Sequence, residues 1–193
     1  MRKQRTFQQY RAIDLTLFAV MLCVSETIIV RAATFWYPDQ LYTVSAVGAI
    51  VTIVLMRWGP WAAIHAALGG LAFTLASGGT PRQILIYCAG NLLALLALLP
   101  LRKFGGEKIR NDQFLSVVFA LFTLLLMQLG RAAVAFVTGA ELRSCFGFLT
   151  TDALSYLFTG VIVWIARRLD GIFEDQKHYL LRVNRPEEEK GGY

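Results

Sequence analysis

The chain has 193 residues, of which 56% are hydrophobic and only 17% are charged. A single soluble core of this size cannot bury so much apolar surface, so the composition excludes an ordinary soluble domain and predicts an integral membrane protein. The formal net charge of +6 does not indicate a nucleic-acid-binding protein, because the basic residues lie between apolar runs and do not form one basic surface. We therefore expect no nucleic-acid partner, and we expect the lipid bilayer to solvate the apolar helices.

Six apolar stretches meet or approach the roughly 20 residues that a helix needs to cross the hydrocarbon layer. The basic residues 1–11 resemble the start of a signal peptide, but the apolar run that follows is long and has no small-residue cleavage site, so we expect it to be retained as a span. The sequence thus predicts an all-α fold, an integral membrane bundle of six transmembrane helices, at residues 12–33, 41–57, 60–77, 82–101, 114–137 and 148–166.

Lys and Arg residues are divided unevenly between the two sides of such a bundle. Fifteen of the nineteen fall on the side of the N-terminus, whereas Arg31, Arg82 and Arg143 fall on the other side and Arg131 falls within a span. Basic residues accumulate in cytoplasmic segments, so we expect a multi-pass protein of the cell (cytoplasmic) membrane with cytoplasmic N- and C-termini. The predicted domains are a basic cytoplasmic N-terminus (1–11), a six-helix transmembrane domain (12–168) and a charged cytoplasmic tail (169–193).

Motifs for catalysis or metal binding are missing from the sequence. Cys23, Cys88 and Cys145 are widely spaced and form no C-x-x-C or Cys/His cluster, so we interpret them as small packing residues. The sequence has no G-x-S-x-G, H-E-x-x-H or P-loop motif. We therefore expect neither an enzyme nor a metal or cofactor site.

Polar residues within the spans are the best candidates for a functional site, because an ionisable group in hydrocarbon is costly unless it is paired or hydrated. Glu26 is predicted in the outer half of the first span, and Arg131 at a similar depth in the fifth, with Gln128 one turn away on the same face. One interpretation is a polar cavity open to the outside, where a guanidinium and an amide hold an anionic or amide-bearing ligand. The alternative is a structural ion pair between Glu26 and Arg131.

Two further pairs of polar residues have helical spacing. Tyr87 and Asn91 are four residues apart in the fourth span, and Asp152 and Tyr156 repeat this spacing in the sixth, so each pair shares a face and could complete the cavity wall. Alternatively, Asn91 makes a single interhelical hydrogen bond and Asp152 caps the start of the last span.

Three other polar residues have simpler interpretations. Asp14 is predicted to serve the N-terminus of the first helix. Arg31 is predicted to snorkel to the interface or to contact a ligand at the cavity mouth. His65 is flanked by alanines and glycines that let helices approach closely, and we expect it to be a packing residue.

In length, number of spans, orientation and basic character, the chain resembles the substrate-binding membrane subunit (S component) of an energy-coupling factor (ECF) vitamin transporter. The resemblance is one of overall plan and covers roughly residues 10–168. In that family the outer halves of the helices and the first outer loop enclose the ligand, a vitamin or related micronutrient. The resemblance therefore implies substrate-binding roles for Glu26, Arg31, Trp36, Tyr37, Asn91, Gln128, Arg131 and Asp152. To these the helical spacing adds Tyr87 and Tyr156.

The resemblance also implies protein partners, namely a transmembrane coupling protein and two cytoplasmic ATPases that drive vitamin uptake. The first helix of the family carries small residues four apart on the face that docks the coupling protein. The nearest match here is Ala19 and Cys23, in which Cys replaces the second Ala. Small residues of the third span, Ala63, Ala67 and Gly70, are expected to share the docking role.

Two other functions are compatible with the sequence. A non-transporting membrane scaffold of the cell-envelope morphogenesis type would act through protein contacts, and it predicts direct contact between Glu26 and Arg131 without an outer cavity. A stand-alone proton-coupled carrier needs an acidic group that titrates during transport, for which Glu26 is the candidate.

Overall fold

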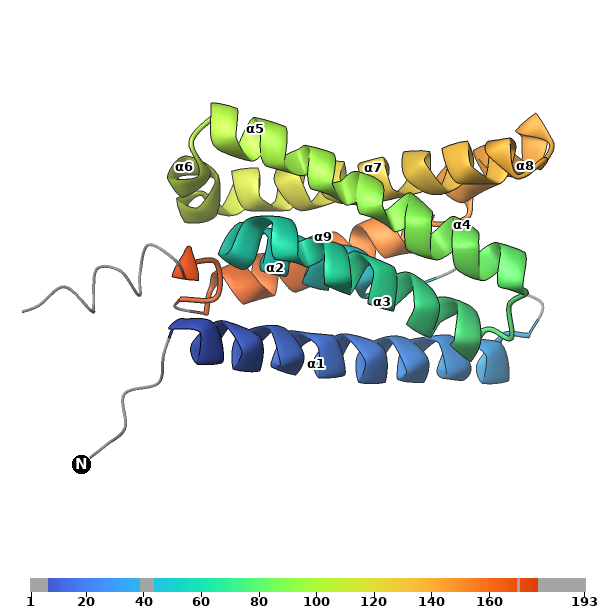
Figure 1. Ribbon diagram of the computed structural model, residues 1–193, viewed down its shortest axis with the longest axis horizontal. Coiled ribbons are helices and arrows are strands. Elements are labelled where there is room, and N and C mark those ends of the chain that lie inside the picture. Colours follow the sequence, from blue (N-terminus) through green and yellow to red (C-terminus); the bar gives the residue numbers. More distant parts are fainter. Residues whose placement is uncertain (1–6, 39–43, 170, 177–193) are drawn as a thin grey trace, which may run out of the picture.

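The computed structural model describes residues 7–38, 44–169 and 171–176, and these residues form helices and turns without a strand, so the predicted all-α fold is confirmed. The long helices lie roughly along the longest axis of the molecule (Figure 1). Within the described ranges, five segments are long and apolar enough to cross a membrane, which agrees with an integral membrane protein. They are Phe7–Trp36, Val47–Ala76, Pro81–Lys103, Gln113–Val137 and Leu142–Arg167.

The helical elements follow one another closely along the chain. Four short segments, two 3-10 (η1 and η2) and two α-helical (α5 and α6), continue or connect the longer helices, and α4, η2 and α5 together form one continuous helical run. The elements are α1 (Phe7–Trp36), α2 (Val47–Trp58), η1 (Gly59–Trp61), α3 (Ala62–Ala76), α4 (Pro81–Asn91), η2 (Leu92–Ala97), α5 (Leu98–Lys103), α6 (Gly106–Asn111), α7 (Gln113–Val137), α8 (Leu142–Thr150) and α9 (Ala153–Arg167).

The apolar segment that contains α2 and α3 is a hairpin and not one straight helix. Gly59, at the end of α2, has a φ of +58°, which glycine adopts without a steric cost, and Pro60 has no N–H with which to continue the helix. A Cβ added to Gly69 of α3 would overlap the side chain of Val47 at the start of α2. This contact, between residues far apart in sequence, shows that α3 runs back along α2.

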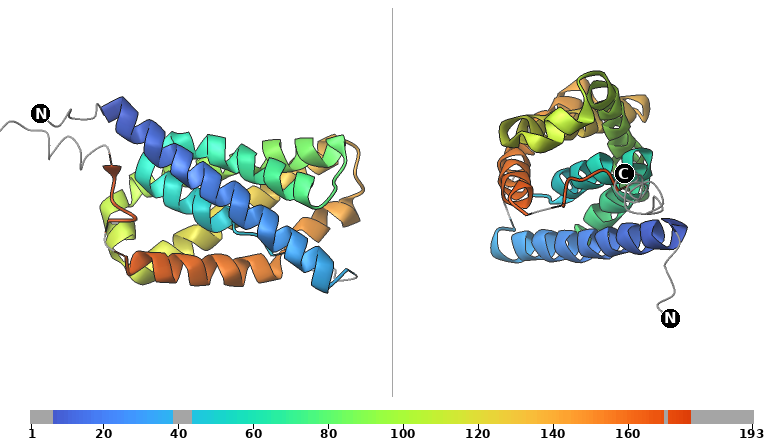
Figure 2. Two further views of the ribbon diagram at one scale, coloured as in Figure 1. Left: turned by 90° about the horizontal axis from the view of Figure 1, so that it is seen from below. Right: turned by 90° about the vertical axis from the view of Figure 1, so that its left-hand side faces the viewer.

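Helix α2 forms the centre of the bundle, because all 12 of its residues are buried. Its sequence is apolar on every side, as expected for a helix surrounded by other helices. Helix α1 is peripheral and buries only Leu22, Glu26 and Val30, and Figure 2 shows it lying obliquely across one face of the bundle. It contacts the first turn of α3, where His65 Nε2 lies 2.9 Å from the Leu15 carbonyl oxygen. His65 is buried at this contact between helices.

Glycines bring three of the helices into backbone contact. A Cβ on Gly70 of α3 would lie 2.6 Å from the carbonyl carbon of Tyr87 in α4. A Cβ on Gly130 of α7 would overlap the carbonyl oxygen of Gly90 in α4. Small residues at such crossings let helices of a membrane bundle pack closely in the absence of a hydrophobic driving force.

Several helix bounds differ from the sequence prediction. α1 begins at Phe7 and not at residue 12. The described part of the predicted N-terminal segment, residues 7–11, is therefore helical. α2 begins at Val47 and not at residue 41, although residues 41–43 lie outside the described ranges. The short helices α6 and α8 were not predicted, and the predicted start of the last span at residue 148 is wrong. A turn at Thr151 separates α8 from α9, and Arg143 interrupts the apolar pattern of α8.

Asp14 does not serve the N-terminus of α1, as the sequence predicted, because α1 begins about two turns earlier. Its carboxylate instead accepts hydrogen bonds from Arg57 Nη2 at 3.0 Å and from the indole N–H of Trp58 at 2.5 Å. This ion pair ties α1 to the last turn of α2.

The described part of the predicted tail packs on the same end of the bundle. Arg57 Nη1 donates to the carbonyl oxygens of Gly171 and Ile172, at 2.8 and 2.9 Å. Phe173 and Gln176 are each only 4% exposed. The segment 171–176 is therefore part of the folded domain, whereas residues 177–193 lie outside the described ranges.

We predict that Gly130→Ala lowers the stability of the protein by about 1–3 kcal/mol, the usual cost of overpacking, because α4 and α7 would have to separate. The measurement is the apparent Tm of the purified protein in detergent. The matched control is Gly160→Ala in α9, where an added Cβ meets Val117 Cγ1 at an ordinary 3.7 Å. An equal Tm for the two variants would contradict the backbone contact at Gly130.

Candidate functional site

Arg131 is the centre of a buried polar cluster formed by α4, α7 and the start of α9. Its side chain is almost fully buried, with 3% of the residue exposed. Nε donates to Asn91 Oδ1 at 2.7 Å, and Nη1 donates to Asp152 Oδ2 at 2.8 Å. The guanidinium carbon lies 4.7 Å from the centre of the Tyr87 ring, which gives a cation–π contact. The charge of Arg131 is thus balanced by one carboxylate and supported by an amide and an aromatic ring.

The cluster continues through two further side chains on α7 and α9. Gln128 Nε2 donates to the same Asp152 oxygen at 3.2 Å, and the Tyr156 hydroxyl donates to Gln128 Oε1 at 2.5 Å. Asn91 Nδ2 donates to the carbonyl oxygen of Ala66 in α3, at 3.0 Å. Asn91 therefore makes two interhelical hydrogen bonds, one to α3 and one to α7, and not the single one that one of the alternatives predicted.

The local sequence explains why these side chains meet. Gly90 and Gly130 directly precede Asn91 and Arg131, so the close approach of the α4 and α7 backbones brings the next two side chains within hydrogen-bonding reach. Asp152 occupies the N-cap position of α9 but its side chain makes no capping hydrogen bond, and its carboxylate is directed to Arg131 instead. The interpretation of Asp152 as a helix cap is therefore wrong.

Glu26 on α1 is fully buried near the same cluster. Its Oε2 accepts the backbone N–H of Ala46 at 2.8 Å, immediately before α2, where the helix dipole favours a negative charge. Oε1 has no partner within hydrogen-bonding distance among the described residues, although the Ser45 side chain also interacts with this carboxylate. The charges of Arg131 and Asp152 act on this carboxylate, but Arg131 makes its ion pair with Asp152. A direct ion pair between Glu26 and Arg131, one of the two interpretations from the sequence, is not formed.

The central helix stops beside this cluster, well before the end of the bundle. Val47, the first residue of α2, packs against Gly69, and α3 continues for seven more residues to Ala76, about 10 Å at 1.5 Å per residue. The chain enters α2 through the non-helical residues 44–46. Non-helical backbone at membrane depth is tolerated only where protein surrounds it or where it lines a cavity.

Three of the predicted site residues lie away from the cluster. Trp36, the last residue of α1, is 69% exposed, and the neighbouring Tyr37 is 64% exposed. Arg31 is exposed and lines a groove of about 320 Å³ between α1 and α3, together with Cys23 and Thr27. The structure therefore brings Glu26, Tyr87, Asn91, Gln128, Arg131, Asp152 and Tyr156 together and leaves Arg31, Trp36 and Tyr37 at the periphery.

Four of the five residues predicted for partner docking lie on the two helices that form this groove, and the fifth is buried inside the bundle. Ala19 and Cys23 of α1 and Ala63 and Ala67 of α3 are half-buried on the two helices that form this groove. Gly70 is buried against the backbone of α4, so it packs inside the bundle and is not available to a partner.

Sequence reasoning missed two features of the site. It did not pair Arg131 with Asp152, although both were placed at the outer end of their spans and have opposite charges. It also missed the contribution of the segment before α2, where Ser45 is buried and the N–H of Ala46 binds Glu26. No side-chain motif could have indicated the second feature, because the donor is a backbone group.

Comparison of the chain with protein-family models, with curated proteins and with solved structures gives no match. The chemistry of the cluster must therefore be judged from its own groups. In the described part of the chain, no three His, Cys, Asp or Glu side chains are grouped in a way that could hold a metal ion. The cluster combines a guanidinium, two amides, two phenols and two carboxylates, which are all groups that make strong hydrogen bonds.

We predict that Asp152→Asn lowers stability by about 3–5 kcal/mol, because it leaves the Arg131 guanidinium buried without a counter-ion. The apparent Tm in detergent measures the effect. The matched control is Asp175→Asn, whose partner Arg110 is more exposed, and we expect a loss of about 1 kcal/mol or less there. Equal losses in the two variants would mean that the Arg131 charge does not depend on Asp152.

Proposed function

We propose that the chain is the substrate-binding membrane subunit of an ATP-driven uptake transporter of the energy-coupling factor type, and that it binds a vitamin-like small molecule from outside the cell. The observation that carries the proposal is the polar cluster around Arg131, with one oxygen of the buried Glu26 left without a partner. Buried ionisable groups in a membrane bundle are costly, and an ion pair that only joined helices would add little over apolar packing. A bound ligand would account both for the buried ionisable groups and for the unpartnered oxygen of Glu26.

The proposed topology has six membrane spans, with α2 and α3 counted as separate helices. Helix α2 is short for a span, about 18 Å at 1.5 Å per residue, but it is surrounded by the other helices and does not need to cover the bilayer thickness itself. The start of α1 and the segment 171–176 lie at the same end of the bundle (Figure 1). We call this end, which carries Arg11, Arg57, Arg102, Arg110 and Arg168, the basic end, and we assign it to the cytoplasmic side of the cell membrane.

In this orientation the polar cluster lies toward the outside, next to the N-terminus of α2. A donor group of the ligand binds Glu26 Oε1, and an anionic or amide group of the ligand takes the place of Asn91 or Gln128 beside Arg131. The ligand thereby replaces hydrogen bonds that these side chains make with one another. The peripheral helix α1, which buries few residues, is the element that yields most readily to admit it.

The coupling protein docks in this proposal on α1 and α3, where Ala19, Cys23, Ala63 and Ala67 offer small side chains. Small residues allow the helices of a partner to approach closely within the bilayer. Two cytoplasmic ATPases supply the energy for release of the ligand.

The second candidate is a stand-alone proton-coupled carrier, which the unpartnered oxygen of Glu26 favours. We expect ligand uptake into membrane vesicles to require the coupling protein, the ATPases and ATP. Proton-driven uptake by the chain alone would contradict the binding-subunit proposal and support the stand-alone carrier. Of the two features that the scaffold alternative predicts, the direct contact between Glu26 and Arg131 is not formed.

We predict that the protein purified from its native membrane retains a small polar molecule that native mass spectrometry detects. Glu26→Gln should weaken its retention about tenfold or more, because a charge-assisted hydrogen bond is lost while the shape of the side chain is kept. The matched control is Glu141→Gln, which removes an exposed carboxylate near the same end of the bundle. Equal retention by both variants, with their Tm unchanged, would contradict a ligand site at Glu26.

A further inference from the structure

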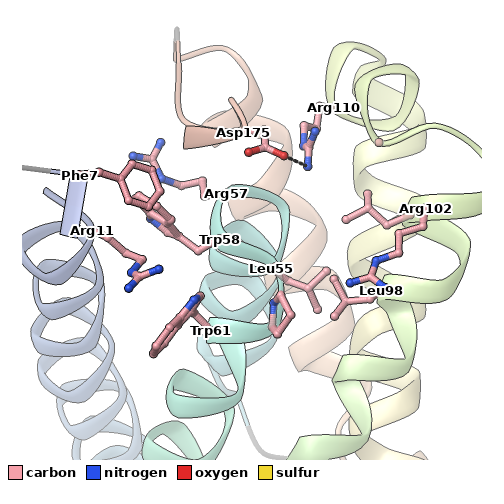
Figure 3. A pocket seen from close by; sticks show the side chains of 14 residues that line it. Phe7, Arg11, Leu55, Arg57, Trp58, Trp61, Leu98, Arg102, Arg110 and Asp175 are labelled. Atoms are coloured by element: carbon pink, nitrogen blue, oxygen red, sulfur yellow. Dashed lines mark hydrogen bonds and ion pairs between the residues drawn. The ribbon is translucent and has the colours of Figure 1, made fainter. Parts of the chain in front are cut away.

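A pocket lies at the opposite end of α2 from the polar cluster. It has a volume of about 640 Å³ and opens at the basic end, between α1, the α2–η1 turn, α5 and α6 (Figure 3). Its lining contains four arginines, Arg11, Arg57, Arg102 and Arg110, and one carboxylate, Asp175.

Two of these arginines are fully engaged within the protein. Arg57 binds the carboxylate of Asp14 through Nε and Nη2, at 3.1 and 3.0 Å. Arg110 donates to the carbonyl oxygen of Met56 at 3.0 Å and pairs with Asp175 at 3.3 Å, the contact drawn as a dashed line in Figure 3. These two charges are therefore balanced by carboxylates and hold the walls of the pocket.

The other two arginines give the pocket its excess positive charge. The Arg11 guanidinium lies 4.4 Å from the centre of the Trp61 ring and 5.6 Å from that of Phe7, so cation–π contacts hold it in position. No acidic side chain of the described residues lies within 4.0 Å of Arg11 or Arg102. Figure 3 shows them on different walls, Arg11 on α1 and Arg102 on α5.

The rest of the lining is apolar. Leu55, Pro60, Leu98 and Leu101 form the pocket wall between the arginines. Trp61 is 43% exposed, and indole rings prefer the interface between lipid headgroups and acyl chains. A site with guanidinium groups at its mouth and an apolar wall suits an amphiphile with an anionic headgroup.

We propose that this pocket binds an anionic phospholipid of the cytoplasmic leaflet. Its phosphate contacts the guanidinium groups of Arg11 and Arg102, and an acyl chain follows Leu98 and Trp61 toward the bilayer. Guanidinium is well suited to phosphate oxygens because its N–H groups donate two parallel hydrogen bonds. Basic pockets between helices on the cytoplasmic side meet a leaflet rich in anionic lipid. The inference rests on the orientation given above but not on a ligand at Glu26.

The test uses native mass spectrometry of the full-length protein, purified in detergent and supplied with equal amounts of phosphatidylglycerol and phosphatidylcholine. We expect preferential retention of phosphatidylglycerol. Arg11→Gln and Arg102→Gln should each weaken this retention about fivefold, as expected for one basic residue near an anionic lipid. Arg11→Lys keeps the charge and should retain most of the binding. The matched control is Arg168→Gln, an exposed arginine at the same end that does not line the pocket and should have no effect.

Four outcomes would overturn the proposal. Equal retention of the two lipids, or an equal loss in the Arg168→Gln control, would mean that no specific site exists. A rise in Tm with soluble glycerol phosphate as large as that with phosphatidylglycerol would identify a site for a soluble anion. Lipid retention that appears only when Glu187, Glu188 and Glu189 are changed to Gln would identify these three residues of the charged tail as the occupant of the pocket. A Tm equal to that of the unchanged protein shows that each variant is folded.

Discussion

Two carboxylates of α1 hold the two ends of the central helix α2, and the rest of the bundle is built around this arrangement. Asp14 and Glu26 are twelve residues apart, and α2 is itself 12 residues long. Because α1 and α2 run in opposite directions, Glu26 meets the backbone N–H of Ala46 before the first turn of α2, and Asp14 meets Arg57 in the last turn. Each contact also suits the helix dipole, with a carboxylate at the N-terminus and a cation at the C-terminus. A peripheral helix with few buried residues is thereby fixed in register by polar contacts.

The length of α2 also determines where polar chemistry can exist in an otherwise apolar bundle. A helix that spanned the whole bilayer would satisfy its own backbone and fill the centre of the bundle with apolar side chains. Because α2 stops early, the space beyond its N-terminus is occupied by Arg131 and its partners, and the space beyond its C-terminus is the arginine-rich pocket. The glycine contact between α4 and α7 then allows Asn91 to reach Arg131. Both regions to which we assign a ligand are consequences of one short helix.

The sequence predicted the all-α fold and the apolar segments well, because hydrocarbon length and turn residues such as Gly59 and Pro60 leave few alternatives. It also identified the residues of the polar cluster, since a charged or amide side chain within an apolar run is conspicuous. It did not predict which of these side chains interact with one another, because the depth of a residue along a span does not indicate which helices are neighbours. Arg131 was compared with Glu26 and not with Asp152, and Asp14 was interpreted without Arg57. The early start of α1 and the late start of α2 were missed because helix ends depend on these tertiary contacts.

The two contacts of α1 differ in how completely they are satisfied, and this difference bears on how a ligand could be admitted. At the basic end both Asp14 oxygens accept donors from Arg57, and Trp58 adds a further hydrogen bond. At the other end Glu26 Oε2 accepts the backbone N–H of Ala46, the Ser45 side chain also acts on the carboxylate, and Oε1 has no partner within hydrogen-bonding distance in the described part of the chain. Fewer interactions must be broken to separate α1 from α2 at Glu26 than at Asp14. A ligand that donates to the second oxygen of Glu26 adds an interaction at the end where α1 and α2 are held less firmly. Ligand binding and the packing of α1 against α2 therefore stabilise each other.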